Sequence, residues 1–330
     1  MQTFNITLYQ QVDTRDLKLF ISNLDFNDYK YYRVFKKKIV CEYIFNQISG
    51  LSTDSKKNWI IIARCKDKIV GLVSLVKLVW AREIFGIEMA EMKHIIIPEE
   101  HKNNKDVIKN LLSFVSRICS QERVSCLYCR VSTDNYSVFH SLEEEGFKIM
   151  DTLVTYLFNK RKHKISPFKS MCQVRLFRDD DMRSLVKMVQ GIFILSHFYK
   201  DSNISRKNAD KFYIRWIQEC CRGSLADKVL VAERNNKILG FLTYKINKEF
   251  YKMTGYKIVG QGLAAVSERG LGIFPALVKS YIQDIVRWYD FGEIDTQINN
   301  YEVIRTCQRF GLDFVRSKFT FHKWFNKTTR

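Results

Sequence analysis

The chain has 330 residues, of which 46% are hydrophobic and 14% aromatic, enough for two domains with large cores. Its formal net charge of +19 indicates an anionic partner, and a nucleotide-bearing substrate and cofactor account for that charge as well as a nucleic acid does. No apolar run approaches the length of a membrane span, and residues 1–7 lack a signal-peptide pattern, so we expect a soluble cytoplasmic protein that does not enter a membrane.

The first half of the chain is predicted to hold a hairpin followed by alternating strands and helices. The expected elements are hairpin strands at 59–64 and 69–73, a strand at 90–97, a helix at 105–119, a strand at 127–131, a helix ending near 145 and a strand at 151–158.

The second half is predicted to repeat this order, with Asp179–Asp181 capping its first helix and Asn235-Asn236 forming the tight turn of its hairpin. The repetition indicates a tandem duplication, with domains at 1–160 and 171–330 joined by a basic linker at 161–170. The expected elements are a strand at 173–176, helices at 182–193 and 206–221, strands at 228–233, 238–244 and 260–266, a helix at 273–289, a strand at 293–298, a helix reaching 310 and a strand at 317–324.

A glycine-rich turn in the second half predicts a pyrophosphate site. Arg269-Gly270-Leu271-Gly272 follows the strand that ends at Val266 and opens the helix at Ile273. The backbone N–H groups of such a turn converge, the helix dipole adds positive potential, and the glycines let a ligand approach the backbone. A strand–helix turn without a ligand is the alternative interpretation.

This turn and a second spacing resemble the GNAT acetyltransferase family. Gly311 lies eleven positions after Asn300, and Gly146 follows Asn135 at the same distance. The resemblance implies an α/β (α+β) fold of tandem GNAT-like domains, each with a central mixed, mainly antiparallel sheet flanked by helices. It also implies acetyl-CoA, or another acyl-CoA, as the co-substrate.

Within the family, the chain is similar to the enzymes that acetylate dTDP-fucosamine (TDP-4-amino-4,6-dideoxy-D-galactose), from residue 79 to its end. The segments that carry this similarity include 79–86, 211–217 and 296–300. They imply an N-acyltransferase for a nucleotide-linked amino sugar, used in polysaccharide biosynthesis. Acylation of another amine (peptide, polyamine or antibiotic) and a non-catalytic tandem GNAT module stay open as alternatives, nucleic acid is not the favoured partner, and a homodimer is compatible with the sequence.

The resemblance also implies where the acyl-CoA binds. The strand backbone would bond the pantetheine arm, and the turn amides would bond the pyrophosphate. Phe274 stands where the family has a small residue, and its ring would contact the cofactor or pack on the sheet. The implied cofactor-binding residues are Leu263, Ala264, Ala265, Val266, Arg269, Gly270, Leu271, Gly272, Ile273, Phe274, Asn299 and Asn300.

Direct acylation of an amine requires a neutral amine, a donor to the developing oxyanion and a proton for the departing thiolate. Cys307 stands where related enzymes have a tyrosine proton donor, and its thiol either takes that role or packs within the helix. The candidate catalytic residues are Cys307, Asn300, His197 and Tyr199. The candidate substrate-binding residues are Tyr199, Arg206, Tyr213 and Trp216, with core packing or solvent exposure as the alternative for each.

The first half lacks the anion-binding turn, because no glycine occurs between Pro98 and Asp106. We therefore expect this half not to bind CoA, and to cover the acceptor cleft or support the second half, with structural roles for His94 and His101. Among the nine cysteines, Cys126 and Cys129 alone have metal-like spacing, and a strand would direct them to opposite faces, so we expect reduced thiols and no metal.

Overall fold

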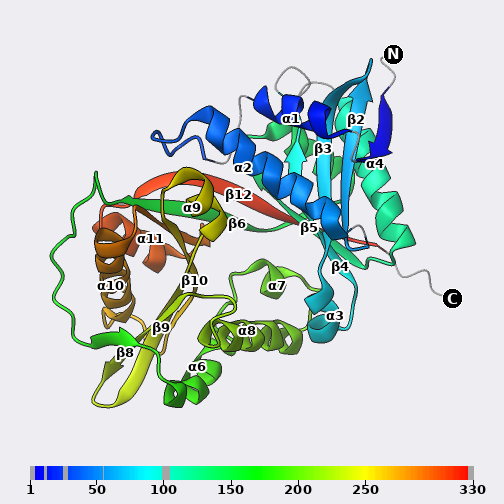
Figure 1. Ribbon diagram of the computed structural model, residues 1–330. Helices are drawn as coiled ribbons and strands as arrows, with labels where there is room; N and C mark the ends of the chain where they lie inside the picture. Colours follow the sequence, from blue (N-terminus) through cyan, green and yellow to red (C-terminus); the bar gives the residue numbers. More distant parts are fainter. Residues whose placement is uncertain (1–3, 11–12, 25–28, 55, 99–104, 326–330) are drawn as a thin grey trace. The chain divides into compact units, whose positions relative to one another are not determined.

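The computed structural model describes residues 4–10, 13–24, 29–54, 56–98 and 105–325 (Figure 1). The chain divides into two compact units. Unit 1 consists of Met1–Met150 and Lys318–Arg330, and unit 2 consists of Asp151–Ser317. His101 and most of the turn segment at 98–106 lie outside the described residues. Within the described ranges, no helix is both long and apolar enough to cross a membrane.

Unit 1 is a mixed sheet with helices on both faces. Its elements are β1 (Asn5–Leu8), α1 (Thr14–Ser22), α2 (Lys37–Gly50), β2 (Asn58–Cys65), β3 (Lys68–Lys77), α3 (Val79–Phe85), β4 (Met89–Ile96), α4 (Lys105–Gln121), β5 (Cys126–Ser132), α5 (Tyr136–Glu144), the first residues of β6 (Lys148–Asn159) and residues 318–324 of β12 (Asp313–Trp324). The sheet order is β1-β2-β3-β4-β5-β12, in which β4 and β5 run parallel and the other neighbours antiparallel.

Unit 2 repeats this order. Its elements are residues 151–159 of β6, β7 (Gln173–Leu176), α6 (Met182–Val189), α7 (His197–Lys200), α8 (Arg206–Cys221), β8 (Lys228–Arg234), β9 (Lys237–Ile246), α9 (Lys248–Thr254), β10 (Ile258–Val266), α10 (Ile273–Trp288), β11 (Phe291–Gln297), α11 (Tyr301–Arg309) and the first residues of β12. The order is β7-β8-β9-β10-β11-β6, with β10 and β11 parallel and the other neighbours antiparallel. The expected pair of mainly antiparallel α/β units is confirmed.

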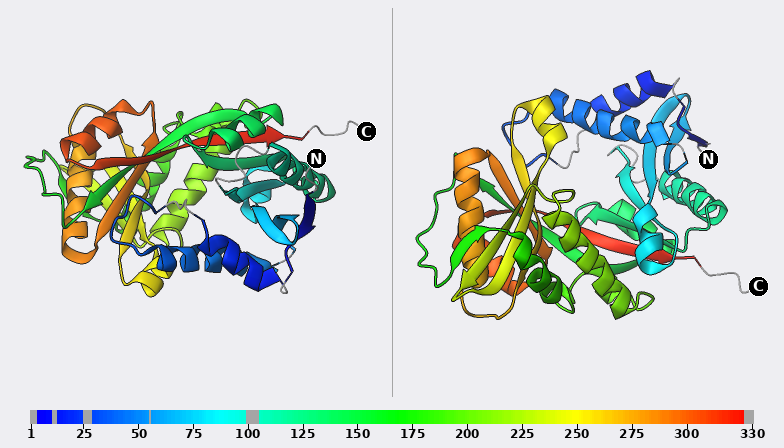
Figure 2. Two further views of the ribbon diagram at one scale, coloured as in Figure 1. Left: turned by 90° about the horizontal axis from the view of Figure 1, so that it is seen from above. Right: turned by 60° about the horizontal axis from the view of Figure 1, so that its bottom comes forward.

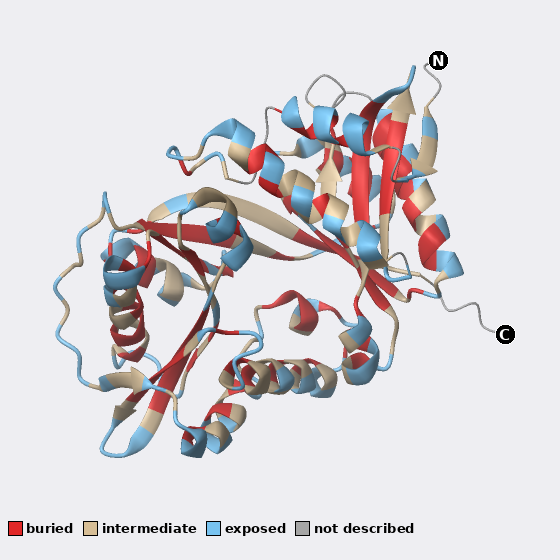
Figure 3. Cartoon of the chain, viewed as in Figure 1, coloured by how far each residue is buried: buried red, intermediate tan, exposed pale blue. Residues whose placement is uncertain are grey.

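Each unit has a separate apolar core on each face of its sheet. In unit 1, α4 and α5 cover one face, and α1 and α2 cover the other. In unit 2, α10 and α11 pack on one face and α6 and α8 on the other, as both views of Figure 2 show. The helices bury one stripe each, which at α4 includes Val107, Leu111 and Val115, one turn apart. Figure 3 shows the same pattern, with buried central strands and exposed outer helix faces.

The final strand of each sheet comes from the other half of the sequence. Residues Lys318–Trp324 of β12 pair with β5, and residues Leu153–Asn159 of β6 pair with β11. The sequence analysis placed the domain boundary at residue 160, where the first half of the chain ends. The compact units differ from it because this exchange moves strand 151–159 into unit 2 and residues 318–330 into unit 1.

The segment around the expected basic linker, from Lys160 to Phe168, contacts other residues of unit 2. Lys160 lies 2.9 Å from Asp290, and Lys162 lies 2.7 Å from Asp313. The ring of Phe168 packs against Phe310, with centroids 6.0 Å apart. Residues 160–168 therefore belong to the body of this unit.

The turn chemistry of the second hairpin is confirmed. Asn235 and Asn236 have φ values of 51° and 59°, the left-handed geometry of a two-residue hairpin turn. The first hairpin uses the same geometry at Lys66 and Asp67, with φ values of 46° and 64°. Asp67 is a residue that favours turns, whereas Lys66 gives no such signal.

Helix α10 lies unusually close to β11 at Gly292. A Cβ atom there would lie 2.1 Å from Ile285 Cδ1 and 3.0 Å from the Tyr281 hydroxyl oxygen. A larger residue at this position would have to displace the Ile285 side chain.

We predict that Gly292→Ala lowers the free energy of unfolding by about 1–3 kcal/mol, because the added methyl group overpacks the core. Urea denaturation measures the change. Gly260→Ala is the matched control on the neighbouring strand, since a Cβ there meets nothing within 4 Å. Equal destabilisation by the two substitutions would contradict the role of close packing at Gly292.

Candidate functional site

The candidate site of unit 2 is the gap that opens between β10 and β11. The two strands pair over Ile258–Gly260 and Phe291–Glu293. In the described residues they form no further ladder pairs, although β10 continues to Val266 and β11 to Gln297. Separated parallel strands leave one backbone edge of each strand available to a ligand.

A β-bulge and one buried tyrosine hold the gap open. The register of β10 against β9 shifts between Gln261 and Ala264, and Thr243 Oγ1 accepts a 2.8 Å hydrogen bond from the displaced Leu263 N–H. The Tyr281 hydroxyl lies 3.0 Å from both the Val259 and the Glu293 carbonyl oxygens and donates at the point where the strands part. Burial raises the pKa of Tyr281, so this hydroxyl stays protonated.

The free edge of β10 faces the gap at alternate residues. Leu263 and Ser267 both direct their N–H groups toward β9, the latter to the Leu239 carbonyl at 2.8 Å. Because backbone groups alternate along a strand, Ala264 and Val266 direct theirs into the gap. These are two of the residues expected to bind the pantetheine arm.

The glycine turn beyond β10 has the geometry of an anion cradle. Gly270 and Gly272 have φ values of 81° and 68°, which favour glycine, and a Cβ at Gly270 would meet only open space. Gly272 is the N-cap of α10 without a side-chain cap, so Ile273 and Phe274 at the helix start have N–H groups without intrahelical acceptors. The residues therefore fit a pyrophosphate. The side chain of Phe274 packs against the α10–α11 core.

Asn300 lies across the gap as the N-cap of α11. Its backbone has φ −89° and ψ 68°, and its Nδ2 donates to Thr296 Oγ1 at 3.0 Å. Asn299 beside it is exposed. The Arg269 side chain reaches the same helix, with Nε 3.7 Å from Glu302 Oε2. The turn and the start of α11 thus border one opening.

Cys307 lies away from this opening. Its side chain is fully buried in the core between the sheet and helices α10 and α11, and burial raises its pKa to about 12. Helices α6 and α8 cover the opposite face of the sheet. The position fits the core-packing alternative and leaves the thiol neutral.

Three residues expected to bind the acceptor, Tyr199, Tyr213 and Trp216, belong to the cluster in which Leu263 and Ala265 pack with α6 and α8. Tyr199 packs against this cluster, and its hydroxyl donates to Asp210 Oδ1, which also accepts the Gly191 N–H at 2.7 Å. Burial, followed by the Asp210 hydrogen bond and charge, raises the pKa of Tyr199. Tyr199 is therefore a neutral phenol anchored beside β10.

The three other expected substrate contacts differ in how far they are exposed. Tyr213 is buried and stacks on Phe193 with centroids 4.2 Å apart, so it is a core residue and not a pocket wall. Trp216 is half-buried and stacks with Tyr213 at 6.1 Å. Arg206 is exposed at the first position of α8.

Asp151 connects the start of α7 with the end of β11. The sequence analysis did not predict this residue. Its Oδ2 accepts the His197 N–H at 2.9 Å and Gln297 Nε2 at 3.4 Å, while its buried Oδ1 has no partner among the described residues. His197 is buried at the start of α7. No sequence signal links residues that lie 46 and 146 positions apart.

Comparison with known proteins supports the fold. No family model matches the sequence, and no curated protein matches it. The structure is similar to a GCN5-related N-acetyltransferase from Sphaerobacter thermophilus, with a TM-score of 0.65 and 12% identity over 97% of this chain and 95% of that one. It is also similar to a tandem GNAT protein from the clavulanic acid biosynthesis pathway, with a TM-score of 0.60 and 9% identity over 99% and 100% of the two chains.

The chain has the tandem GNAT fold. A GNAT-family acetyltransferase from Colwellia psychrerythraea matches 97% of this chain and 100% of its own, with a TM-score of 0.52 and 10% identity. In this tandem GNAT fold, the parted strands of unit 2 are β10 and β11, and those of unit 1 are β4 and β5.

We predict that Cys307→Ala retains turnover within about threefold of the wild type and lowers stability by about 1–2 kcal/mol, because the thiol fills a core site. Steady-state kinetics and urea denaturation measure the two effects. The basic limb of the pH–rate profile should stay in place. A hundredfold loss of kcat in a folded variant would instead make the thiol the proton donor.

Proposed function

We propose that unit 2 transfers an acyl group from acyl-CoA, with acetyl-CoA as the expected donor, to an amine. The observation that carries the proposal is the continuity of the free edge of β10 with the turn at Gly270 and Gly272. An extended amide-containing arm fits the first, and a pyrophosphate fits the second. No residue of the proposal requires a metal.

In this proposal one set of residues binds the acyl donor and another set positions the acceptor. When bound, acyl-CoA would supply a thioester carbonyl. Attack by a neutral amine forms the amide bond, breaks the carbon–sulfur bond and releases CoA as a thiolate, which takes up the proton that the amine loses. The N–H groups of Ala264 and Val266 bind the donor arm, and the turn amides compensate phosphate charge. On the other side, Asp151 holds the start of α7 and so positions His197 and Tyr199 near the acceptor. Tyr199 acts there as a hydrogen-bonding phenol, since its pKa is raised.

The amine is proposed to belong to a nucleotide-linked amino sugar in the cytoplasm. The choice of substrate rests on the resemblance of segments 79–86, 211–217 and 296–300 to dTDP-fucosamine acetyltransferases that the sequence analysis describes. The net charge of +19 is compatible with a substrate and a donor that both carry phosphates. Arg206, exposed at the start of α8, is proposed to meet the nucleotide phosphates.

We predict that the full chain acylates at least one 3-amino or 4-amino sugar nucleotide with acetyl-CoA, as detected by mass spectrometry. Gly270→Trp should reduce this activity more than a hundredfold, because the indole would occupy the turn. Gly255→Trp is the matched control, since Gly255 has a similar φ of 73° and open space at Cβ but ends α9. It should retain at least a third of the activity.

The amine panel also includes a polyamine, a lysine peptide and an aminoglycoside. Acylation of one of these without any sugar product would overturn the sugar proposal and keep the acyltransferase. Failure to acylate every amine, together with no binding of acetyl-CoA, would overturn the acyltransferase itself.

A further inference from the structure

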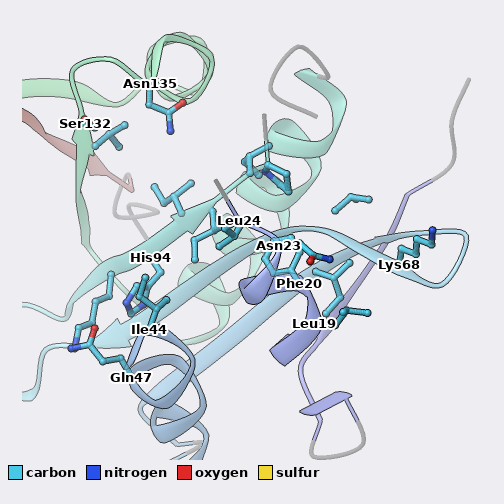
Figure 4. A pocket seen from close by; sticks show the side chains of 18 of the residues that line it. Leu19, Phe20, Asn23, Leu24, Ile44, Gln47, Lys68, His94, Ser132 and Asn135 are labelled. Carbon is cyan, nitrogen blue, oxygen red and sulfur yellow. The ribbon is translucent and has the colours of Figure 1, made fainter. Parts of the chain in front are cut away.

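Unit 1 contains a cavity of about 880 Å³ that the proposed transfer reaction does not use (Figure 4). Helices α1 and α2 form one wall, with Leu19, Phe20 and Ile44, and β4 and β5 form another, with His94 and Ser132. All of its lining residues belong to unit 1. Its volume lies in the range of pockets that hold small molecules, about 300–1,000 Å³.

At the back of the cavity, β4 and β5 separate in the same way as β10 and β11 do in unit 2. Strands β4 and β5 pair from Met89 to Met92, and no later ladder pair occurs in the described residues. A bulge again follows, and the His94 N–H donates to Ser74 Oγ at 3.1 Å, as Leu263 does to Thr243. His94 thus directs its N–H toward β3, so Ile95 directs its N–H and carbonyl into the gap. An amide group is the natural partner for both.

Asn135 supplies a second polar group at this gap. It has φ −95° and ψ 68° at the start of α5, nearly the backbone conformation of Asn300 in unit 2. Its Oδ1 is buried and has no hydrogen-bond partner among the described residues. A buried acceptor without a partner is unfavourable, and a ligand N–H would satisfy it.

The rest of the lining mixes apolar side chains with polar ones such as Asn23 and Gln47, and the charged groups at the cavity are mainly cationic. Six lysine or arginine side chains line it against three aspartates. Asp16 and Asp134 are already paired, with Arg64 at 3.0 Å and Lys30 at 3.2 Å. The net charge therefore favours an anionic ligand. The sequence between Pro98 and Asp106 contains no glycine turn for a pyrophosphate, so a carboxylate is the simpler anion.

We propose that unit 1 is a second binding site, for a small carboxylate that carries an amide next to an apolar group. An N-acylated amino acid is the simplest compound of this class. Its amide pairs with the free edge of β4 at Ile95, its apolar side chain contacts Leu24 and Ile44, and its carboxylate lies near Lys93. This site is additional to the acyl-CoA site proposed for unit 2.

Isothermal titration of the full chain with N-acetyl-leucine, N-acetyl-methionine and N-acetyl-phenylalanine tests the proposal. At least one should bind with one site per chain. N-acetyl-leucinamide, which lacks the carboxylate, should bind at least tenfold more weakly than N-acetyl-leucine. Lys93→Glu and the cavity-filling Ile44→Trp should each weaken binding at least tenfold, whereas Lys109→Glu, on an exposed position of α4 outside the cavity, should not.

Gly270→Trp separates this proposal from the acyl-CoA site, because it should abolish acetyl-CoA binding and leave N-acyl amino acid binding unchanged. Absence of saturation by all three compounds up to about 10 mM would overturn the proposal. Binding that is insensitive to both Lys93→Glu and Ile44→Trp would also overturn it. Displacement of the bound compound by acetyl-CoA in Gly270→Trp would show that unit 1 is a CoA site instead.

Discussion

The site of unit 2 depends on one constraint: two parallel strands that must separate without leaving buried backbone groups unpaired. At the bulge of β10, the Leu263 N–H loses its ladder partner, and the Thr243 hydroxyl replaces that partner at 2.8 Å. Such a group left unsatisfied would cost about 1–3 kcal/mol. The Tyr281 hydroxyl has one proton, which it donates to the Val259 or the Glu293 carbonyl at the same point. These two contacts satisfy backbone groups beside the gap, while the N–H groups of Ala264 and Val266 stay directed into it.

Unit 1 solves the same problem with Ser74 and His94, which shows that both halves keep the parted strands. The halves differ in the segment that comes after the first parted strand. Unit 2 continues into Gly270 and Gly272, and unit 1 has no glycine in the corresponding sequence. One scaffold thus supports two different proposals: an acyl-CoA site where the turn is present, and a carboxylate site where it is absent.

Much of this fold can be predicted from local sequence. The bounds of α8, the Asn235-Asn236 turn and the start of α10 are all set by residues within a few positions of them. The exchange of final strands cannot be predicted in this way, because residues 154–158 are buried on both faces of β6 and such a pattern specifies no partner strand.

The side-chain roles were harder to predict for a related reason. Helices cover both faces of each sheet, so an apolar helical stripe does not distinguish a core from a cleft wall. Tyr213 and Cys307 both lie on such stripes, and both are buried in cores. Asp151 gave no signal, since its partners His197 and Gln297 come from distant segments.

Hydrogen–deuterium exchange with and without acetyl-CoA tests the central claim most directly, because it reports on backbone amides. We expect slowed exchange in residues 261–274, which hold the free edge of β10 and the glycine turn, and no change in residues 93–98 of unit 1. Protection of 93–98 with none at 261–274, or no protection in either segment, would contradict an acyl-CoA site in unit 2.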